Sequence, residues 1–339
     1  MINIGIMGMA SIAVKRMIPA ILKDEEFVLK YIAVATGEEH GLSEDISGKI
    51  TRVTEYAESV GAACVVGYEE LLKKSDVDAI YIPLPPALHY KWAMKALEHG
   101  KDVILEKPFT TSYRDTEELV KAADSLGRTV IENYGFTSHN QISIIKKILE
   151  EKQIGELALV RASFGFPHRD NNDFRYDKDL GGGALLDCGG YTLKAASLFL
   201  GDSVKILGSS LRITQGHEVD IYGNALLVND EGLNASVSFG MDNSYKCELE
   251  IWGSKGVVVA SRFFTAPDGF EAPVTVKLNN GEETKYTASD DQFLRVLEQY
   301  KNCKSDESFN LNNNKEILLQ ASLVEGARGR FSGPSHPGT

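Results

Sequence analysis

Cysteine is scarce in this sequence: Cys64, Cys188, Cys247 and Cys303 are the only four among 339 residues. No two of them are close enough in the chain to form a metal knuckle or a redox pair, so neither a zinc site nor a disulfide framework is expected. We therefore expect reduced thiols, as in a cytosolic protein, and no metal site.

Positive charge and long apolar runs are also lacking. The chain has 36 Lys and Arg against 48 Asp and Glu, a formal net charge of −12 without a basic stripe, so no nucleic-acid partner is expected. An anionic small molecule remains compatible with this charge, because one site can be locally positive. No apolar run reaches the ~18 residues of a membrane span, and no basic segment precedes the apolar N-terminus as in a signal peptide. A cytoplasmic location without a membrane partner is expected.

In the first third of the chain, short apolar runs alternate with helical patterns. The runs lie at 2–7, 27–35, 77–85, 102–105 and 129–134, and the helical patterns at 12–23, 49–61, 88–100 and 113–127. Pro19 must bend or split the first helix. Strands separated by helices pair in parallel through right-handed crossovers, so residues 1–135 are predicted to form a doubly wound α/β domain of the Rossmann type.

After about residue 135 the pattern changes to strands with few helices between them. Strand-like segments lie at 157–166, 204–214, 218–229, 234–241, 246–253, 256–260 and 274–280, and helices at 141–155, within 181–201, and near 291–302 and 314–329. Such a run of strands indicates an open-faced, mostly antiparallel sheet. Residues 136–330 are predicted to form an α+β domain for substrate binding and oligomerisation, whose last helix can pack back on the first domain. A flexible tail is expected at 331–339.

The first strand leads into the segment GIMGMASIA, residues 5–13. Its small residues stand at a strand-to-helix turn, where a dinucleotide pyrophosphate requires close backbone approach and a helix N-terminus. A plain tight turn would use the same residues, and Ala10 stands where glycine is usual. The place of this turn between the first strand and the first helix favours the nucleotide. The residues predicted to bind the cofactor here are Gly8, Ala10, Ser11 and Ile12.

The tip of the second strand determines the preferred nicotinamide cofactor. An acid there would bind the ribose 2′-hydroxyl of NAD, whereas small polar and basic residues accept the 2′-phosphate of NADP. The tip consists of Thr36 and Gly37; Glu38 comes slightly later, and no Arg is in place, although Lys49 or Arg52 could fold back. We therefore predict NADP, with NAD as the alternative; Thr36 is a predicted cofactor residue. The other interpretation is that this acidic loop is simply solvated.

The segment DVILEKPFTTS, residues 102–112, places an acid, a base and a proline directly after a buried strand. In a doubly wound fold the carboxyl end of such a strand points at the cofactor, so Glu106 and Lys107 are predicted to lie beside the nicotinamide. Pro108 fixes φ and removes a donor, which holds the pair in one direction. A lysine there can hydrogen-bond a substrate oxygen and stabilise developing negative charge.

At this point the chain resembles the Gfo/Idh/MocA oxidoreductases over essentially its whole length. The resemblance rests on GIMGMASIA (5–13), IPLPPALHYKWAMKALEHGKDVILEKP (82–108) and GGGALLDCGGYTLKAA (181–196), in that order. It implies a Rossmann domain followed by an open-faced sheet, nicotinamide chemistry on carbohydrate-like substrates, and oligomers. By this resemblance Lys107 is the family lysine. The other residues placed on the cofactor side are Pro83, Leu84, His89 and Glu106.

The second catalytic element is expected in DCGGY, residues 187–191, where Asp187 and Tyr191 share a helix face. Many family members have His in place of this tyrosine. Those with Tyr resemble glucose–fructose oxidoreductases, dihydrodiol dehydrogenases and nucleotide-sugar ketoreductases, which argues against an inositol-dehydrogenase-like member. A protonated tyrosine, with a pKa of about 10, can donate its proton as hydride reaches a carbonyl carbon, and a neighbouring Lys107 would lower that pKa. Asp187 would orient a substrate hydroxyl or the lysine. The alternatives are a half-buried aromatic and a first-turn acid favoured by the helix dipole.

Within the family the sequence is most similar to nucleotide-sugar 3-ketoreductases of deoxysugar pathways, which reduce a ketone on a sugar attached to a nucleoside diphosphate. In FPHRDNNDFRY, residues 166–176, His168, Arg169 and Arg175 precede the catalytic helix, where a diphosphate requires cations. An ordinary polar surface loop is the alternative. The predicted substrate-binding residues are His168, Arg175 and, from the segment after residue 131, Tyr134.

Two other functions remain compatible with the sequence. One is a dehydrogenase of a free sugar or a trans-dihydrodiol that uses the same catalytic pair. The other is a sugar-nucleotide sensor without turnover, against which Lys107, Asp187 and Tyr191 argue. A sheet with one face free of helices leaves apolar surface that must be covered. We therefore expect a homodimer or homotetramer, with a sugar or nucleotide-sugar as the small-molecule partner.

Overall fold

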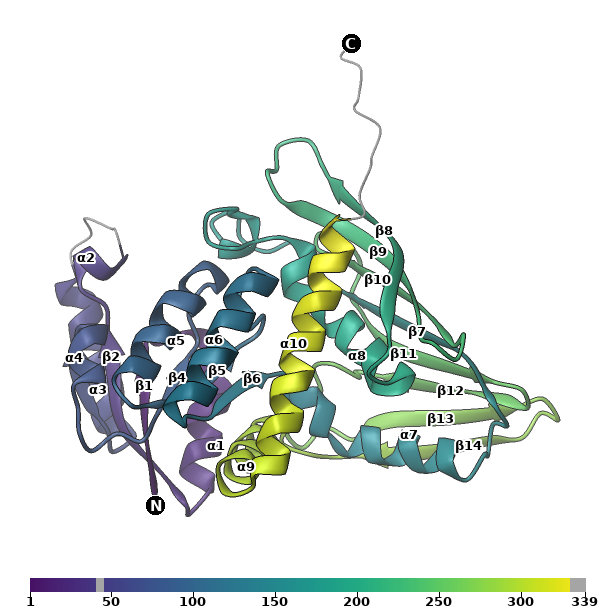
Figure 1. Ribbon diagram of the computed structural model, residues 1–339, viewed down its shortest axis with the longest axis horizontal. Coiled ribbons are helices and arrows are strands. Elements are labelled where there is room, and N and C mark those ends of the chain that lie inside the picture. The colour runs from purple at the N-terminus through teal and green to yellow at the C-terminus, as the bar shows by residue number, and fades with distance from the viewer. Residues whose placement is uncertain (41–45, 330–339) are drawn as a thin grey trace, which may run out of the picture. The chain divides into compact units, whose positions relative to one another are not determined.

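The computed structural model describes residues 1–40 and 46–329 and consists of two units (Figure 1). Unit 1 contains Met1–Asn133 and Phe293–Ile317, and unit 2 contains Tyr134–Gln292 and the chain from Leu318 onward. The tail predicted at 331–339 lies outside the described residues.

Unit 1 is built on a parallel sheet of six strands in the order β3-β2-β1-β4-β5-β6. The strands are β1 (Ile2–Met7), β2 (Phe27–Val34), β3 (Ala63–Val66), β4 (Ala79–Ile82), β5 (Asp102–Glu106) and β6 (Val130–Asn133). This order confirms the predicted doubly wound fold. Strand β3 was not predicted: it is a four-residue strand at the sheet edge with exposed residues at both ends, and so short a run carries little apolar pattern.

Helices connect these strands in the order that the alternation predicts. They are α1 (Ile18–Lys23), α2 (Gly37–His40), α3 (Ser47–Ser59), α4 (Tyr68–Leu72), α5 (His89–Glu98) and α6 (Tyr113–Leu126). Residues 11–23 are helical without a break: a π-helical turn, η1 (Ala13–Met17), runs directly into α1, and Pro19 lies in the first turn of α1, so the predicted helix changes type before the proline and is not split.

The core of unit 1 also contains a helix from the far end of the chain, α9 (Gln292–Ser305). Its apolar side chains pack with Ile4 and Ile104 of the parallel sheet in one buried cluster; they are Phe293, Val296, Leu297 and Tyr300. The helix is tied further by Tyr300, whose hydroxyl donates to the buried Asp102 carboxylate at 2.8 Å. The long helix α10 (Glu307–Gly329) follows, and its first part belongs to unit 1.

Unit 2 contains a sheet of eight strands in the order β14-β13-β12-β11-β7-β10-β9-β8. The strands are β7 (Leu157–Gly165), β8 (Lys205–Ile213), β9 (Asp220–Val228), β10 (Asn234–Gly240), β11 (Lys246–Gly253), β12 (Gly256–Ser261), β13 (Ala272–Leu278) and β14 (Glu283–Ala288). Only β7 and β10 pair in parallel, so the predicted mostly antiparallel sheet is confirmed. The polar edge strand β14 was not predicted.

The two faces of this sheet differ. Strand β7 alternates between buried Val160 and Ala162 on one face and Arg161 and Ser163 on the other. Helices α7 (Asn140–Glu150) and α8 (Gly190–Leu200) add their apolar side chains to the buried face (Figure 1). The opposite face, called here the outer face, has no covering helix among the described residues of unit 2. Across the described chain, every helix is too short or too polar to be a membrane-span candidate.

Candidate active site: a nucleotide half and a tyrosine half

The turn after β1 is shaped for close approach to its backbone. Gly8 has a φ of +85°, which side-chain-bearing residues rarely adopt, and a Cβ there would lie 3.1 Å from the Tyr68 hydroxyl oxygen. Ala10, Ser11 and Ile12 follow and lead into the π-helical turn, and Ser11 and Ile12 are exposed. All four predicted cofactor residues of the turn thus lie together at the carboxyl end of β1, and their contact with a cofactor stays a prediction.

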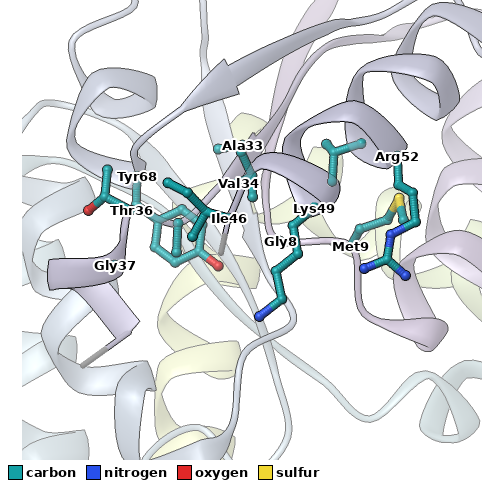
Figure 2. A pocket seen from close by; sticks show the side chains of 12 residues that line it. Gly8, Met9, Ala33, Val34, Thr36, Gly37, Ile46, Lys49, Arg52 and Tyr68 are labelled. Carbon is teal, nitrogen blue, oxygen red and sulfur yellow. The ribbon is translucent and has the colours of Figure 1, made fainter. Parts of the chain in front are cut away.

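A pocket of about 270 Å³ lies between this turn, the tip of β2 and helix α3 (Figure 2). Thr36, the predicted cofactor residue at the tip, lines it. The remaining lining residues are Gly8, Met9, Ala33, Val34, Ala35, Gly37, Ile46, Lys49, Arg52, Val53 and Tyr68. This is the place where a doubly wound domain receives the adenosine part of a dinucleotide.

Glu39, one turn beyond the tip of β2, serves the protein's own backbone. Its carboxylate accepts hydrogen bonds from the backbone N–H of Thr36 at 2.8 Å, of Tyr68 at 3.0 Å and of Glu69 at 3.1 Å. Burial alone would raise the pKa of Glu39, but these backbone donors outweigh it and lower the pKa below its usual value. This role of Glu39 was not predicted, because Tyr68 and Glu69 lie far along the chain.

The loops after β4 and β5 are joined through His89. The ring is fully buried, with Nδ1 2.8 Å from the carbonyl oxygen of Pro108 and Nε2 2.7 Å from that of Leu84. Burial lowers the pKa of His89, so the neutral ring donates its single N–H to one of these carbonyl oxygens. His89 therefore positions the loops that carry Pro83, Leu84 and Lys107, whereas direct contact with the cofactor remains a prediction.

Glu106 ends β5 and is held between two neighbouring strands. Its Oε1 accepts hydrogen bonds from the Tyr81 hydroxyl and from Asn133 Nδ2, both at 2.6 Å. Burial raises the pKa of this carboxyl, although the two donors and Lys107 counteract the shift. The peptide bond between Lys107 and Pro108 is cis. Both chain neighbours of the predicted catalytic lysine are held: Glu106 by these two hydrogen bonds, and the Pro108 carbonyl by its contact with His89.

The predicted catalytic tyrosine, Tyr191, lies in unit 2. Tyr191, near the start of α8, packs its ring against those of Tyr134 and Phe164, each with centroids 5.1 Å away. Two glycines precede it, and a Cβ at Gly190 would lie 2.2 Å from the Tyr134 hydroxyl oxygen. Tyr134 itself is buried, and its hydroxyl accepts a hydrogen bond from Gln320 Nε2 at 3.3 Å. The glycines of DCGGY therefore allow Tyr134 to pack beside Tyr191.

Asp187 and Arg175 form an ion pair that the sequence did not predict. Arg175 Nε donates to Asp187 Oδ2 at 2.8 Å, and Arg175 Nη1 donates to Asp173 Oδ1 at 3.0 Å. Burial alone would lower the pKa of Arg175, but the two carboxylates raise it above its ordinary value. Asp187 lies in a π-helical turn, η5 (Leu185–Gly189), that continues into α8. The predicted catalytic acid and the predicted substrate cation are therefore direct partners.

His168 belongs to a polar cluster at the turn between β10 and β11. Its Nδ1 lies 3.0 Å from Asp242 Oδ1 and its Nε2 lies 2.9 Å from Asn171 Oδ1. These two hydrogen bonds raise the pKa of His168. The Tyr176 hydroxyl donates to the same Asp242 carboxylate at 2.6 Å, so the loop that contains His168 is fastened to this turn.

Comparisons with known proteins add to this geometry. Residues 2–134 match a family model described as an oxidoreductase family with an NAD-binding Rossmann fold, and residues 142–259 match the Gfo/Idh/MocA C-terminal domain. A dTDP-3,4-didehydro-2,6-dideoxy-α-D-glucose 3-reductase of Actinomadura kijaniata is 35% identical, covering 96% of this chain and 95% of the relative. A reductase of the same name from Saccharopolyspora spinosa is 33% identical, covering 96% of both chains.

A solved structure is also similar over nearly its whole length. It is a 3-ketoreductase from Actinomadura kijaniata, carrying phenylalanine in place of a tyrosine, in complex with TDP-benzene and NADP; the TM-score is 0.89, the identity 34%, and 97% of each chain is covered. Other structures of that protein carry alanine or glutamate in place of a lysine. With both domain models matched in order along one chain, this protein belongs to the Gfo/Idh/MocA family of oxidoreductases.

Proposed function

We propose that this oxidoreductase reduces a ketone on a sugar linked to a nucleoside diphosphate, with NADPH as the hydride donor. The observation that carries the proposal is the similarity over nearly the full length of both chains to relatives named as dTDP-3,4-didehydro-2,6-dideoxy-α-D-glucose 3-reductases. A dTDP-linked 3-ketosugar is accordingly the substrate class that we propose.

The proposed catalytic residues are Lys107, Tyr191 and Asp187. In the related 3-ketoreductase, the substituted lysine and tyrosine are separated by the same number of residues as Lys107 and Tyr191 are here. The nicotinamide, when bound, supplies the hydride that adds to the carbonyl carbon. The Tyr191 hydroxyl gives its proton to the oxygen on which negative charge develops, and the Lys107 ammonium stabilises that charge. Asp187, which is paired with Arg175, orients a substrate hydroxyl or Lys107 in this proposal.

The residues of unit 1 fit an NADP molecule. Gly8 has the positive φ of a turn that approaches phosphate, and Thr36 leaves the tip of β2 without an acid. The carboxylate of Glu39 is engaged by three backbone N–H groups. Among the described lining residues of the pocket there is no carboxylate that would repel a 2′-phosphate.

We propose that the cations of unit 2 bind the diphosphate of the substrate. Arg175 is held in one orientation by Asp173 and Asp187, which suits planar recognition of an anion. His168 is half-exposed, and its raised pKa favours the charged form. Tyr134 acts in this proposal by supporting the Tyr191 ring, and its contact with substrate stays a prediction.

Turnover on matched substrates tests the proposed function. Loss of NADPH fluorescence would be followed with a dTDP-linked 3-ketosugar generated in situ and with the same ketosugar without its nucleotide. We expect turnover only with the nucleotide-linked sugar. Oxidation of a free sugar or a trans-dihydrodiol, without activity on the nucleotide-linked sugar, would instead identify a dehydrogenase. Tight NADPH binding without turnover on any of these compounds would indicate a sensor.

We also propose that the protein forms a homodimer or homotetramer through the outer face of unit 2, and that it is located in the cytoplasm. The assembly proposal is supported by apolar side chains on that face, among them Leu226 and Trp252, which are 52% and 40% exposed. The cytoplasmic location is supported by the reduced state expected for its four cysteines.

A further inference from the structure

We infer that Lys49 and Arg52 of helix α3 bind the 2′-phosphate of NADP and set the preference for NADP over NAD. The inference rests on the cofactor part of the proposed function and is independent of the sugar substrate. Under this inference, the residues that discriminate NADP from NAD lie on α3, the helix that follows the second strand. Dinucleotide-binding domains commonly place such residues at the tip of that strand.

The two cations line the same wall of the pocket described above. They are three residues apart on α3, a spacing that brings side chains to one face of a helix. Figure 2 shows the side chains of Lys49 and Arg52 among those that line the pocket, together with Met9 and Thr36. The turn after β1 and the tip of β2 therefore share one pocket of about 270 Å³ with both cations.

The charges around this pocket favour a dianion. Its described lining contains two cations and no carboxylate. Among the acids whose side chains are described, Glu39 is the closest in sequence to the tip of β2. Both of its carboxylate oxygens accept hydrogen bonds from backbone N–H groups, at distances between 2.8 and 3.1 Å. An acid used in this way cannot accept a hydrogen bond from a ribose hydroxyl without losing its own partners. Glu39 is thus committed to the protein backbone.

The side chains of Lys49 and Arg52 also have the chemistry that discriminates the two cofactors. Arg52 is exposed, and its Nε makes only a long hydrogen bond of 3.4 Å to the carbonyl oxygen of Gly48. Guanidinium N–H donors can pair with two oxygens of one phosphate, and an ammonium adds a point charge. The 2′-hydroxyl of NAD offers no charge to either residue. Removing the cations should therefore weaken NADPH binding selectively.

Binding measurements on side-chain variants test the inference. Lys49→Met and Arg52→Met keep the apolar stems but remove the charges, and Lys73→Met is the matched control. Lys73 pairs with Glu70 on the surface of the same unit, and it does not line the pocket. Dissociation constants for NADPH and NADH would be measured by nicotinamide fluorescence. Adenosine 2′,5′-bisphosphate and AMP would be compared by calorimetry as probes without the nicotinamide.

Each pocket variant should weaken NADPH binding by about tenfold to a hundredfold, the range expected for loss of a hydrogen bond to a charged group. Affinity for NADH should be unchanged, and adenosine 2′,5′-bisphosphate should lose affinity in parallel with NADPH. Arg52→Lys, which keeps the charge, should retain part of the preference. Lys73→Met should behave as wild type, and equal thermal unfolding temperatures would show that all variants are folded.

The outcomes separate this inference from the proposed function. If wild type prefers NADPH and the variants keep the same NADPH-to-NADH ratio, the assignment to Lys49 and Arg52 is wrong while the choice of cofactor stands. If wild type does not prefer NADPH, both the assignment to Lys49 and Arg52 and the choice of NADP as cofactor are wrong. A parallel loss of NADPH and NADH affinity would show that the two side chains only support the adenosine. Failure of sugar reduction would leave these binding results unaffected.

Discussion

The Tyr191 hydroxyl is the group for which a small chemical change should have the largest effect on turnover. The Tyr191 ring packs against Tyr134 and Phe164, so the phenyl ring of Tyr191→Phe should occupy the same place. The variant lacks only the hydroxyl group that would donate the proton. We predict a fall in turnover of ~10²–10⁴-fold with unchanged NADPH affinity, because general acid catalysis typically contributes that much. Lys107→Ala should lose at least as much. The losses in the double variant should not multiply, since groups that act as a unit are non-additive.

Steady-state kinetics of the two single variants and the double variant would measure these effects. Tyr286→Phe is a matched control. Tyr286 lies on the edge strand β14, its hydroxyl donates to Gln153 at 3.3 Å, and it has no proposed part in catalysis. Near-normal turnover of Tyr191→Phe would mean that Lys107 or water supplies the proton and that Tyr191 only packs.

Glu39 provides a second test at the scale of one side chain. Its folded pKa is lowered, so its contribution to stability is present above the unfolded pKa of about 4.3 and is lost as pH falls through the lower folded pKa. At neutral pH, Glu39→Gln should reduce the free energy of unfolding by about 1 kcal/mol, because a partly exposed charged acceptor is replaced by a neutral one. Urea unfolding would show the difference shrinking toward pH 3. Glu58→Gln, at an exposed position of α3, should show no such dependence.

At the scale of elements, α9 is held to the parallel sheet by apolar packing and by two side chains, Tyr300 and Lys304, that donate to the buried Asp102 carboxylate. The fully buried Tyr300 donates to Asp102, whose other oxygen accepts from the Thr129 backbone N–H at 3.0 Å. Tyr300→Phe should destabilise unit 1 by about 1 kcal/mol, the net contribution of one hydrogen bond, because Lys304 still pairs with the same Asp102 oxygen.

The chain offers a matched control for this contact. The Tyr31 hydroxyl also donates to a carboxylate, Asp76 at 3.2 Å, but on the surface. Tyr31→Phe should therefore change the free energy of unfolding by less than about 0.5 kcal/mol. Denaturant unfolding of both variants would measure the difference. Equal effects would show that the Tyr300 hydroxyl contributes no more than an exposed one.

The elements also show how far the sequence predicts this fold. Strand-helix alternation and Gly-rich turns are local signals, and they predicted the parallel sheet, its carboxyl-end loops and the mostly antiparallel second sheet. The short or polar strands β3 and β14 carry too little apolar pattern to be found. The pairing of Arg175 with Asp187 and the capping of α4 by Glu39 depend on how distant segments fold together. The fold and its carboxyl-end loops were therefore predictable and the partners of most candidate residues were not, while the roles of those residues remain predictions.

At the scale of the whole molecule, the outer face of unit 2 should determine the assembly. It carries exposed Leu226 and Trp252 and a hollow of about 400 Å³ lined by residues of β7, β9, β10 and β11. We predict that wild type is a dimer or tetramer by sedimentation velocity and that Leu226→Arg dissociates it, because a charge would be buried without a partner. Leu126→Arg, at a comparably exposed position of α6, is the control. A wild-type monomer at micromolar concentration would contradict the prediction.

The return of α9 to the parallel sheet has a consequence for biosynthesis. The ribosome releases the strands of unit 1 first, but the apolar surface that Phe293, Val296, Leu297 and Tyr300 cover stays open until the chain is nearly finished. The unit made first is therefore completed last, after the eight-stranded sheet has emerged. Nascent chains stalled before residue 292 should expose this surface to chaperones, and a gene fragment that ends at Asn133 should give an aggregation-prone product.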